Sequence, residues 1–360
     1  MQRFEKLRGK KRKKMTFLKN YDPVSLPRFV DELRRGMPIR FTDGDAFRLF
    51  PAEHMGDTLP AAGELRLLIT GARARSMGHD TTDDAVRMDV TGLEPAYIRA
   101  LFDPLADSTP PALPVQAASP AERLLLALAK LASLMPALLM APDAGAPDMP
   151  ALSYETLQSY FSRMDGAAVE TARARLPIAG AEDTRIISYR MKDGVSTHLA
   201  LLIGSPETSE NPMVRLHSSC VTGDILESLR CDCGSQLRDA VSVMASQGGG
   251  ILLYLHQEGR GIGLTNKLRA YALQERGFDT YTANLMLGFD EDERDFTLAA
   301  SILKKLGVSR IRLLTNNPRK IEALTSCGIE VSERIPLAIR PGAHNQAYLD
   351  AKANKSGHLF

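Results

Sequence analysis

Short apolar runs alternate with amphipathic stretches in the second half of the chain. The runs LALLIGS, ILLYL and RIRLLT occupy residues 199–205, 251–255 and 310–315. Their length and aliphatic content are typical of buried strands. Two stretches, residues 264–277 and 295–307, carry apolar side chains at helical spacing and end at a glycine, a common helix stop. Strands that alternate with helices predict an α/β domain built on a mixed sheet.

The first half of the chain has a different pattern. Residues 26–100 alternate short apolar runs with turns, which predicts a smaller α/β domain. Residues 103–120 are rich in proline and predict a linker or an extended surface loop. Ser119 and Pro120 supply an N-cap and a first helical position, so a helix is expected over residues 121–134.

A second stretch rich in Pro and Ala ends near Leu152, and we place the domain boundary there. The expected division is a disordered basic tail over residues 1–14, an N-terminal α/β domain with its proline-rich linker over 15–150, and a catalytic domain over 151–360. The tail carries eight Lys or Arg and one Glu, whereas the whole chain has a net charge of +2. Such a run binds nucleic acid or anionic lipid, or is a disordered extension ahead of a true start at Met15. We favour the extension.

Composition excludes several classes of protein. The 360 residues are 44% hydrophobic and 24% charged, which is typical of a folded chain and not of one disordered throughout. No stretch approaches the roughly 18 apolar residues of a membrane span, which argues against an integral membrane protein. No apolar segment follows the basic tail, so we expect no secretory signal and a reducing, cytoplasmic location.

The strongest chemical signal is a cluster of three cysteines, Cys220, Cys231 and Cys233. Zn²⁺ favours thiolates, and three protein ligands with one open position are typical of a catalytic zinc. Two alternatives stay open at this point. His217 or the distant Cys327 would close the site as a fourth ligand, or Cys231 and Cys233 would form a redox pair, although one intervening residue strains a disulfide.

A glycine-rich loop follows the expected strand over residues 251–255. Gly259, Gly261 and Gly263 lie between this strand and the next helix, where backbone N–H groups can approach an anion. Arg260 strengthens the prediction of phosphate contact, because a guanidinium group matches phosphate oxygens. Glu258 would read a base edge or pair with Arg260.

A third segment, TNNPRKIEAL, points to a second anion contact. Asn317 is expected as an N-cap and Pro318 as the first helical residue. Arg319 and Lys320 then oppose the helix dipole in the first turn. Cations placed there favour a bound phosphate over a solvated face.

Two further features have ordinary structural explanations when taken alone. Residues 290–293 are all acidic and crowd an expected helix start, where they would complement the dipole. Tyr271 follows Leu264 and Leu268 at helical spacing, which favours a core position over a catalytic one.

Taken together, the motifs resemble a known family. RLHSSCVTGDILESLRCDCGSQL, HQEGRGIGLTNKLRAYALQ, LGFDEDERDF and TNNPRKIEAL are similar to the signature blocks of GTP cyclohydrolase II, the first enzyme of riboflavin biosynthesis. The resemblance covers residues 169–360 in order. It implies hydrolysis of GTP to 2,5-diamino-6-ribosylamino-4(3H)-pyrimidinone 5′-phosphate, formate and pyrophosphate by a protein that is typically a homodimer.

The resemblance also implies roles for individual residues. Cys220, Cys231 and Cys233 would bind Zn²⁺, and the activated water would attack C8 of the guanine ring. Asp292 would be the proton acceptor and Tyr271 would assist. Arg294 would act at the α-phosphate, either as a nucleophile or by stabilising charge, since guanidinium groups are protonated near neutral pH. GTP, with Mg²⁺ on its triphosphate, would be held by Arg215, Leu216, His217, Ser218, Ser219, Gln236, Glu258, Gly259, Arg260, Thr280, Thr315 and Lys320.

Ser219 departs from the family pattern, which usually has Glu at this position. The departure leaves open a paralogue that acts on another nucleotide or stops at a formamido intermediate. A non-enzymatic nucleotide sensor or nucleic-acid-binding regulator is the more distant alternative, and nucleic acid is not the expected partner.

In the N-terminal domain, the stretch ELRRGMPIRFTDGDAFRLFPAEHM occupies residues 32–55. It faintly resembles the start of 3,4-dihydroxy-2-butanone 4-phosphate synthase, which is often fused ahead of this cyclohydrolase. That family needs a dense acidic loop to bind Mg²⁺ and substrate, whereas Asp43 and Asp45 are the two carboxylates in the corresponding stretch. We therefore expect a degenerate, non-catalytic domain that serves structure, dimerisation or regulation.

Overall fold

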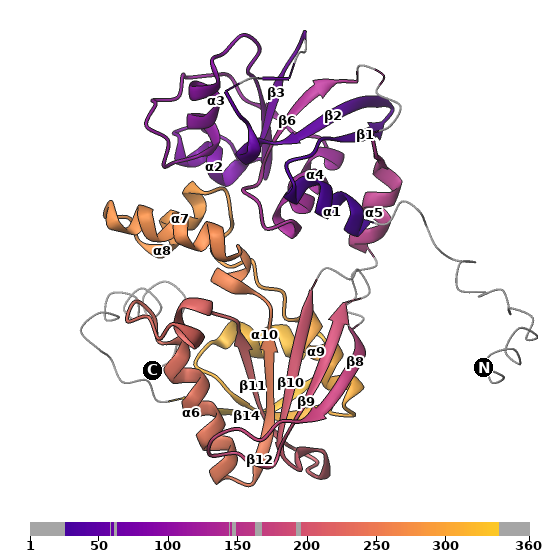
Figure 1. Ribbon diagram of the computed structural model, residues 1–360, viewed down its shortest axis with the longest axis vertical. Helices are drawn as coiled ribbons and strands as arrows, with labels where there is room; N and C mark the ends of the chain where they lie inside the picture. The colour runs from indigo at the N-terminus through magenta and orange to yellow at the C-terminus, as the bar shows by residue number, and fades with distance from the viewer. Residues whose placement is uncertain are drawn as a thin grey trace, which may run out of the picture.

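The computed structural model contains two seven-stranded sheets, one from each half of the chain (Figure 1). It describes residues 26–57, 59–60, 63–143, 145, 149–162, 168–191 and 196–337. The mixed α/β fold predicted from the sequence is confirmed. The basic tail over residues 1–14 lies outside the described residues.

The first sheet has the strand order β5-β4-β3-β6-β2-β1-β7, antiparallel except where β7 runs parallel to β1. Its strands are β1 (Ile39–Asp43), β2 (Asp45–Pro51), β3 (Arg66–Thr70), β4 (Ala85–Asp89), β5 (Gln116–Ala117), β6 (Ala137–Pro142) and β7 (Ala151–Ser153). The helices of this half are α1 (Leu26–Arg34), α2 (Gly71–Ser76), α3 (Pro95–Phe102), α4 (Pro120–Leu131) and α5 (Tyr154–Ser162), with a 3₁₀ turn, η3, at Ala52–His54.

Alternation along the strands gives the first sheet two apolar faces. Leu68 and Leu138 pack with α1, α4 and α5, whereas their neighbours Leu67 and Leu139 face the other way, toward α3. Because successive strand residues point to opposite faces, both faces need a covering layer. The start of α4 is fixed as expected, since Ser119 and Glu122 form a reciprocal capping box.

The second sheet has the order β14-β13-β11-β12-β10-β9-β8. Its strands are β8 (Ala168–Arg175), β9 (Thr184–Met191), β10 (Thr197–Gly204), β11 (Met213–Ser218), β12 (Gly249–Leu255), β13 (Arg310–Leu314) and β14 (Glu330–Ile335). The strands β12, β11, β13 and β14 run parallel, and β8, β9 and β10 extend the sheet in antiparallel fashion. The helical segments are α6 (Cys233–Ser246), α7 (Leu264–Glu275), α8 (Thr280–Met286), α9 (Thr297–Lys305) and α10 (Pro318–Ser326), with short turns η4 (Pro206–Thr208), η5 (Val221–Ile225) and η6 (Glu258–Gly261).

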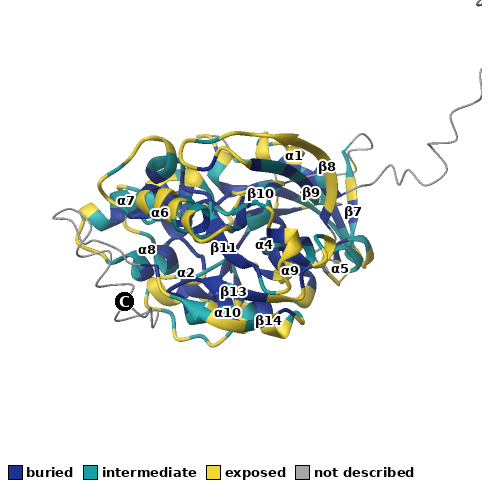
Figure 2. Ribbon diagram, turned by 90° about the horizontal axis from the view of Figure 1, so that it is seen from below, coloured by how far each residue is buried: buried dark blue, intermediate teal, exposed yellow. Residues whose placement is uncertain are grey.

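Helices cover both faces of the second sheet. Ile251, Leu253 and Leu255 of β12 pack with α9 and α10, while Leu252 packs with α6. The strands and helices expected in this half are therefore confirmed. In Figure 2 the central strand β11 is buried, whereas the edge strand β8 is exposed along most of its length.

The helices α7 and α8 leave the second sheet and cover the first one. Ala270, Leu273, Ala283 and Leu287 belong to the same buried cluster as Leu67. In Figure 1 the two helices lie between the sheets, beside α2. The second half of the chain thus supplies a layer of the N-terminal core.

The Pro- and Ala-rich stretch before Leu152 contains β6, a central strand, whose buried run ALLMA lies between two prolines. Two expectations about local structure need correction. The first sheet continues past residue 150, since β7 pairs with β1 and Leu157 of α5 is buried in the same cluster as Leu152. The acidic residues 290–293 precede α9, which begins at Thr297, so they lie in a loop and not in the first helical turn.

Candidate functional site

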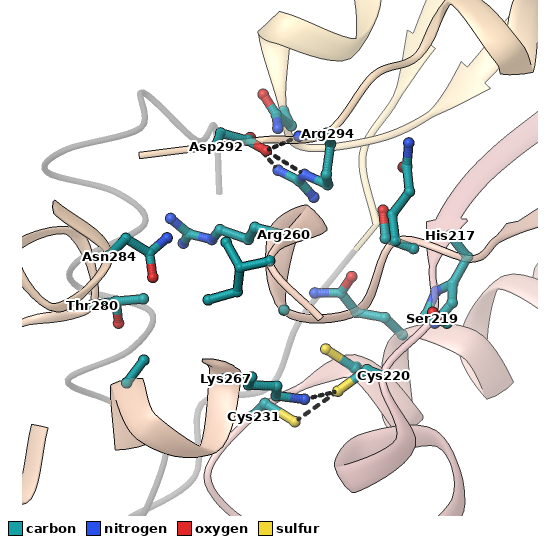
Figure 3. Close-up of a pocket in the computed structure, with 18 of the residues that line it drawn as sticks. His217, Ser219, Cys220, Cys231, Arg260, Lys267, Thr280, Asn284, Asp292 and Arg294 are labelled. Carbon is teal, nitrogen blue, oxygen red and sulfur yellow. Dashed lines mark hydrogen bonds and ion pairs between the residues drawn. The ribbon is translucent and has the colours of Figure 1, made fainter. Parts of the chain in front are cut away.

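The candidate site lies at the carboxyl ends of the parallel strands β11, β12 and β13. Parallel strands present their carboxyl ends at one edge, where ligands commonly bind in open α/β sheets. The segments that follow these strands begin at Ser219, His256 and Thr315. Together with α7 and α8 they enclose a cavity of about 410 Å³ (Figure 3).

The three cysteines meet at one end of this cavity. The Sγ atoms of Cys220, Cys231 and Cys233 lie within 4.8 Å of one another, and all are free thiols. Gly223 makes the close approach possible, because a Cβ there would lie 2.8 Å from the Sγ of Cys231 and 2.8 Å from the Cβ of Cys233. Its N–H also donates to the Sγ of Cys220 at 3.3 Å. Three converging sulfurs fit Zn²⁺, which prefers thiolate ligands.

The side chains weighed as fourth ligands lie elsewhere. The Nε2 atom of His217 is hydrogen-bonded to Asp224 at 3.0 Å, and burial lowers the pKa of this histidine. Cys327 caps the end of α10 and packs against the core beneath α9. Neither belongs to the metal-ligand cluster found among the described residues, so a fourth protein ligand from these two is ruled out in this structure.

Asp224 organises the loop that carries the first ligand. Its carboxylate accepts hydrogen bonds from the backbone N–H of Cys220 at 3.0 Å, the hydroxyl of Tyr254 at 2.9 Å and the ring of His217. The rings of His217 and Tyr254 stack with their centroids 5.6 Å apart. This buried network fixes Cys220 from the side of the sheet.

Lys267 fixes the same cysteine from the side of α7. Its Nζ donates to the Sγ of Cys220 at 3.0 Å and to Glu258 Oε1 at 2.7 Å. Burial opposes the charge, but these hydrogen bonds raise the pKa of Lys267 above its usual value. Hydrogen bonds from Cys231 and Cys233, reinforced by Lys267, lower the pKa of the Cys220 thiol. An ammonium group therefore faces the thiolate cluster.

Glu258 has a different environment from either one expected. Its Oε2 accepts the backbone N–H of Val221 at 2.7 Å, while its Oε1 binds Lys267. The carboxylate joins the cysteine loop to α7, and the residue does not line the cavity.

Cationic groups also line the cavity. Arg215 of β11 is buried and donates to the Leu314 carbonyl and to Gln236, and burial lowers its pKa to about 10. Lys320 of α10 donates to the Leu216 carbonyl at 2.7 Å. Within the part of the chain that the structure describes, Arg215 Nε and the hydroxyls of Ser218 and Ser219 are buried without a hydrogen-bond partner. These polar atoms are available to a ligand.

The glycine-rich loop brings Arg260 over the cavity. Arg260 has a left-handed backbone, φ 62°, and its guanidinium lies 4.7 Å from the centroid of the Tyr281 ring. Gly261 follows with φ 96°, and a Cβ there would come within 2.8 Å of the Glu293 backbone. A glycine is therefore required where this loop meets the loop before α9.

Asp292 and Arg294 form an ion pair at the far end of the cavity. Arg294 donates from Nε to Oδ1 at 2.7 Å and from a terminal nitrogen to Oδ2 at 2.6 Å. Burial raises the pKa of Asp292, but the hydrogen bonds and charge of Arg294 outweigh it, so the pKa lies below its usual value. The carboxylate is thus ionised near neutral pH.

Tyr271 faces the cavity from α7, and the expectation of a core position is wrong. Leu264 and Leu268 are 38% and 51% exposed, so the stripe that they form with Tyr271 does not face the core. The guanidinium of Arg230 lies 4.8 Å from the Tyr271 ring centroid. Burial raises the pKa of Tyr271, which keeps the phenol protonated.

The cavity gathers every residue that the resemblance implied except Glu258. These are Arg215, Leu216, His217, Ser218, Ser219, Cys220, Cys231, Cys233, Gln236, Gly259, Arg260, Tyr271, Thr280, Asp292, Arg294, Thr315 and Lys320. Sequence reasoning missed Lys267, Asp224 and Tyr254. Lys267 could have been found from the sequence, since it lies four residues before Tyr271 and therefore on the same side of one helix. No local pattern marks Asp224 or Tyr254.

Comparison with known proteins agrees with this geometry. The family model for GTP cyclohydrolase II matches residues 169–336. GTP cyclohydrolase-2 of Cronobacter sakazakii is 52% identical over 189 residues, which are 52% of this chain and 95% of that protein. The chain belongs to the GTP cyclohydrolase II family. GTP cyclohydrolase-2 of Azospirillum brasilense is 47% identical over 243 residues, which are 65% of this chain and 63% of that protein.

The match to the family model lies in the second half of this chain. Among solved structures, a two-domain 3,4-dihydroxy-2-butanone 4-phosphate synthase from A. baumannii aligns with 88% of this chain and 100% of its own, at 16% identity and a TM-score of 0.31. A score this low does not establish a shared fold. Among the described residues, the helices are all too short or too polar to cross a membrane.

Proposed function

We propose that the chain hydrolyses GTP to 2,5-diamino-6-ribosylamino-4(3H)-pyrimidinone 5′-phosphate, formate and pyrophosphate, as the first step of riboflavin biosynthesis. The observation that carries the proposal is the presence of three thiols and several cationic side chains in one cavity of about 410 Å³. Thiolates suit a metal that activates water, and guanidinium groups suit a triphosphate. Family membership supports the same assignment.

Zn²⁺ would be held by Cys220, Cys231 and Cys233, whose sulfurs already converge. When bound, this metal acts as a Lewis acid and makes water a nucleophile at neutral pH. The chain itself orients the ligands: Gly223 leaves room for the sulfurs, while Lys267 and Asp224 hold the Cys220 loop. A reducing, cytoplasmic environment belongs to the proposal, because the three thiols must stay reduced to bind metal.

The groups for proton transfer lie on opposite walls. The Tyr271 phenol would donate to a ring nitrogen as its bond to C8 breaks, whereas Asp292, which is ionised and lies beside Arg294 away from the sulfurs, would accept the proton of the water that attacks the α-phosphate. Two waters would be consumed at C8: the first adds to the carbon and one C–N bond breaks to leave a formamide, and the second hydrolyses the formamide so that the carbon leaves as formate.

The phosphates would lie among Arg294, Arg260 and Lys320, with Mg²⁺ entering as part of the substrate. Arg294 already donates two hydrogen bonds to Asp292, so a stabilising role at the α-phosphate fits its geometry better than direct attack. A third water would cleave the bond between the α- and β-phosphates, and the guanidinium groups would stabilise the charge on departing pyrophosphate.

The test is incubation of zinc-loaded protein with GTP and Mg²⁺, with separate measurement of formate, pyrophosphate and the pyrimidine. Cys231→Ser should lose zinc and formate release, whereas Cys327→Ser, which alters a thiol outside the cluster, should keep both. Equal zinc content and equal turnover in the two variants would contradict the proposal. A homodimer, expected from the family, is tested in the same preparation by light scattering.

Ser219 favours one second candidate. Its hydroxyl is buried beside Cys220 without a partner among the described residues, in the position where the family usually has Glu. The candidate is a paralogue that releases pyrophosphate but stops at a formamido product. Pyrophosphate together with a formamidopyrimidine, and without formate, would identify it. Pyrophosphate with neither formate nor a pyrimidine would mean that ring opening fails, and equal amounts of formate and pyrophosphate would exclude the candidate.

A further inference from the structure

The wall of the cavity formed by α7 and α8 packs on the N-terminal sheet. Leu273 and Phe289, at 0% and 1% exposure, are buried with Leu67 and Ile69 of β3. The same segment presents Tyr271 to the cavity on its other side. One side of this wall is therefore set by the N-terminal core.

Buried polar contacts fix the end of α8 to the same sheet. Thr70 donates from its hydroxyl to the carbonyl of Gly288 at 2.8 Å. Arg73 donates to the carbonyl of Met286 at 3.2 Å and to that of Leu101, at the end of α3, at 2.9 Å. A cation at the carboxyl ends of two helices satisfies carbonyls that would otherwise lack partners.

Lys130 connects the N-terminal half to the loop that carries the ion pair of the cavity. Its Nζ lies 2.5 Å from Glu293 Oε1. Glu293 stands between Asp292 and Arg294 in the sequence, and its backbone N–H donates to the carbonyl of Arg260 at 3.0 Å. Lys130 thus contacts the only residue that separates these two members of the site.

We propose that the N-terminal half, residues 26–162, is a built-in brace for this wall, and that Lys130 is a positioning residue for Asp292 and Arg294. The inference rests on the proposed function for its effect on turnover. About half of this chain matches nearly all of the Cronobacter protein, so the brace belongs to the part outside that match.

The proposed brace predicts that loss of the Lys130 contact changes kcat more than it changes KM. Arg215, Thr315 and Lys320 belong to the second sheet and its helices. Arg215 donates to the Leu314 carbonyl, Lys320 donates to the Leu216 carbonyl, and Thr315 accepts the backbone N–H of Asn317, all within the second half of the chain. Loss of the Lys130 contact should leave these groups in place while Asp292 and Arg294 lose their alignment. Because misplacement by about 1 Å can cost up to about 100-fold in rate, kcat should fall more than KM rises.

The experiment compares full-length, zinc-loaded Lys130→Met, Lys130→Arg and Arg87→Met. Arg87 forms an ion pair with Glu122 at 3.2 Å inside the N-terminal half, so its variant is a matched control for lost charge. Lys130→Met should lower kcat about tenfold with KM changed by less than about threefold, and should speed hydrogen exchange in residues 280–294. Lys130→Arg should restore both, and Arg87→Met should change neither.

Unchanged kcat in Lys130→Met overturns the inference, and so does an equal loss of kcat in Arg87→Met. Should the wild type lack GTP turnover, the proposed function fails by itself, and hydrogen exchange still decides the brace. Exchange in residues 280–294 that is the same in wild type and Lys130→Met would then overturn it.

Discussion

Lys267 and Cys220 are joined by a hydrogen bond of 3.0 Å from Nζ to Sγ, although they are 47 residues apart in the chain. The same ammonium group binds Glu258, which in turn accepts the N–H of Val221. The cysteine loop is therefore tied to α7 by a closed set of buried contacts. Since α7 also packs on the N-terminal sheet, this helix connects the cysteine loop to the N-terminal core.

Lys267→Met should destabilise the protein strongly. The side chains of Lys267 and Glu258 are 10% and 7% exposed, so the substitution leaves a buried carboxylate without its cation. Removal of one partner from such a pair costs about 3–5 kcal/mol. Urea denaturation should show this loss in the free energy of unfolding, and Lys267→Met with Glu258→Gln should recover part of it. A double variant no more stable than the single one would refute the interpretation.

Asp292→Asn should reduce kcat by about 10²- to 10⁴-fold, the usual range for loss of a general base. Zinc content should not change, because Asp292 lies at the opposite end of the cavity from the sulfurs (Figure 3). Steady-state kinetics and metal analysis on the same sample check both statements. A loss below about threefold would remove Asp292 from the catalytic role.

The same pair predicts a pH dependence of stability. Burial raises the pKa of Asp292, but Arg294 lowers it by a larger amount, so the folded-state pKa lies below that of the unfolded chain. Its contribution is complete above the unfolded value, about 4, and is lost as the pH falls through the folded value. The difference in melting temperature between wild type and Asp292→Asn should be constant from about pH 8 to 5 and shrink below about pH 4. A difference that grows on acidification would contradict the sign.

Ser219→Glu should raise kcat/KM for GTP. Ser219 lines the cavity, and a carboxylate there can accept hydrogen bonds from the N–H groups of guanine. A hydrogen bond to a charged group contributes about 1.5–3 kcal/mol, which corresponds to roughly 10- to 150-fold. Ser219→Gln is the matched neutral control and should gain less. No gain with Glu, or an equal gain with Gln, would exclude this role.

Phe289→Ala tests whether α7 and α8 belong to the N-terminal core. Phe289 is 1% exposed, so truncation should cost about 3–5 kcal/mol. Leu268→Ala, on the exposed side of α7, should stay within about 0.5 kcal/mol. Phe289→Ala should also speed hydrogen exchange in β3 (Arg66–Thr70), which packs in the same cluster. Unchanged exchange in β3 would show that the cluster does not act as one core.

Local patterns in the sequence predicted most of the regular structure. The runs that became β10, β12 and β13 are apolar enough to be buried on either face, and Ser119 with Pro120 marks the start of α4. The pattern failed for residues 290–293, because acidic residues suit both a helix start and a loop with distant cationic partners. It also failed at Tyr271, since helical spacing gives a stripe of side chains but not the surface that the stripe faces.

The sequence by itself determined the α/β class, the three cysteines and the resemblance that gathered the cavity residues, since these depend on local spacing and residue type. Only the tertiary structure showed that Lys267 meets Cys220, that Lys130 meets Glu293 and that α7 and α8 complete the N-terminal core. Each of these contacts joins segments far apart in the chain. Burial and charge pairing select such partners only after the two sheets have formed, and no periodicity within one segment encodes them.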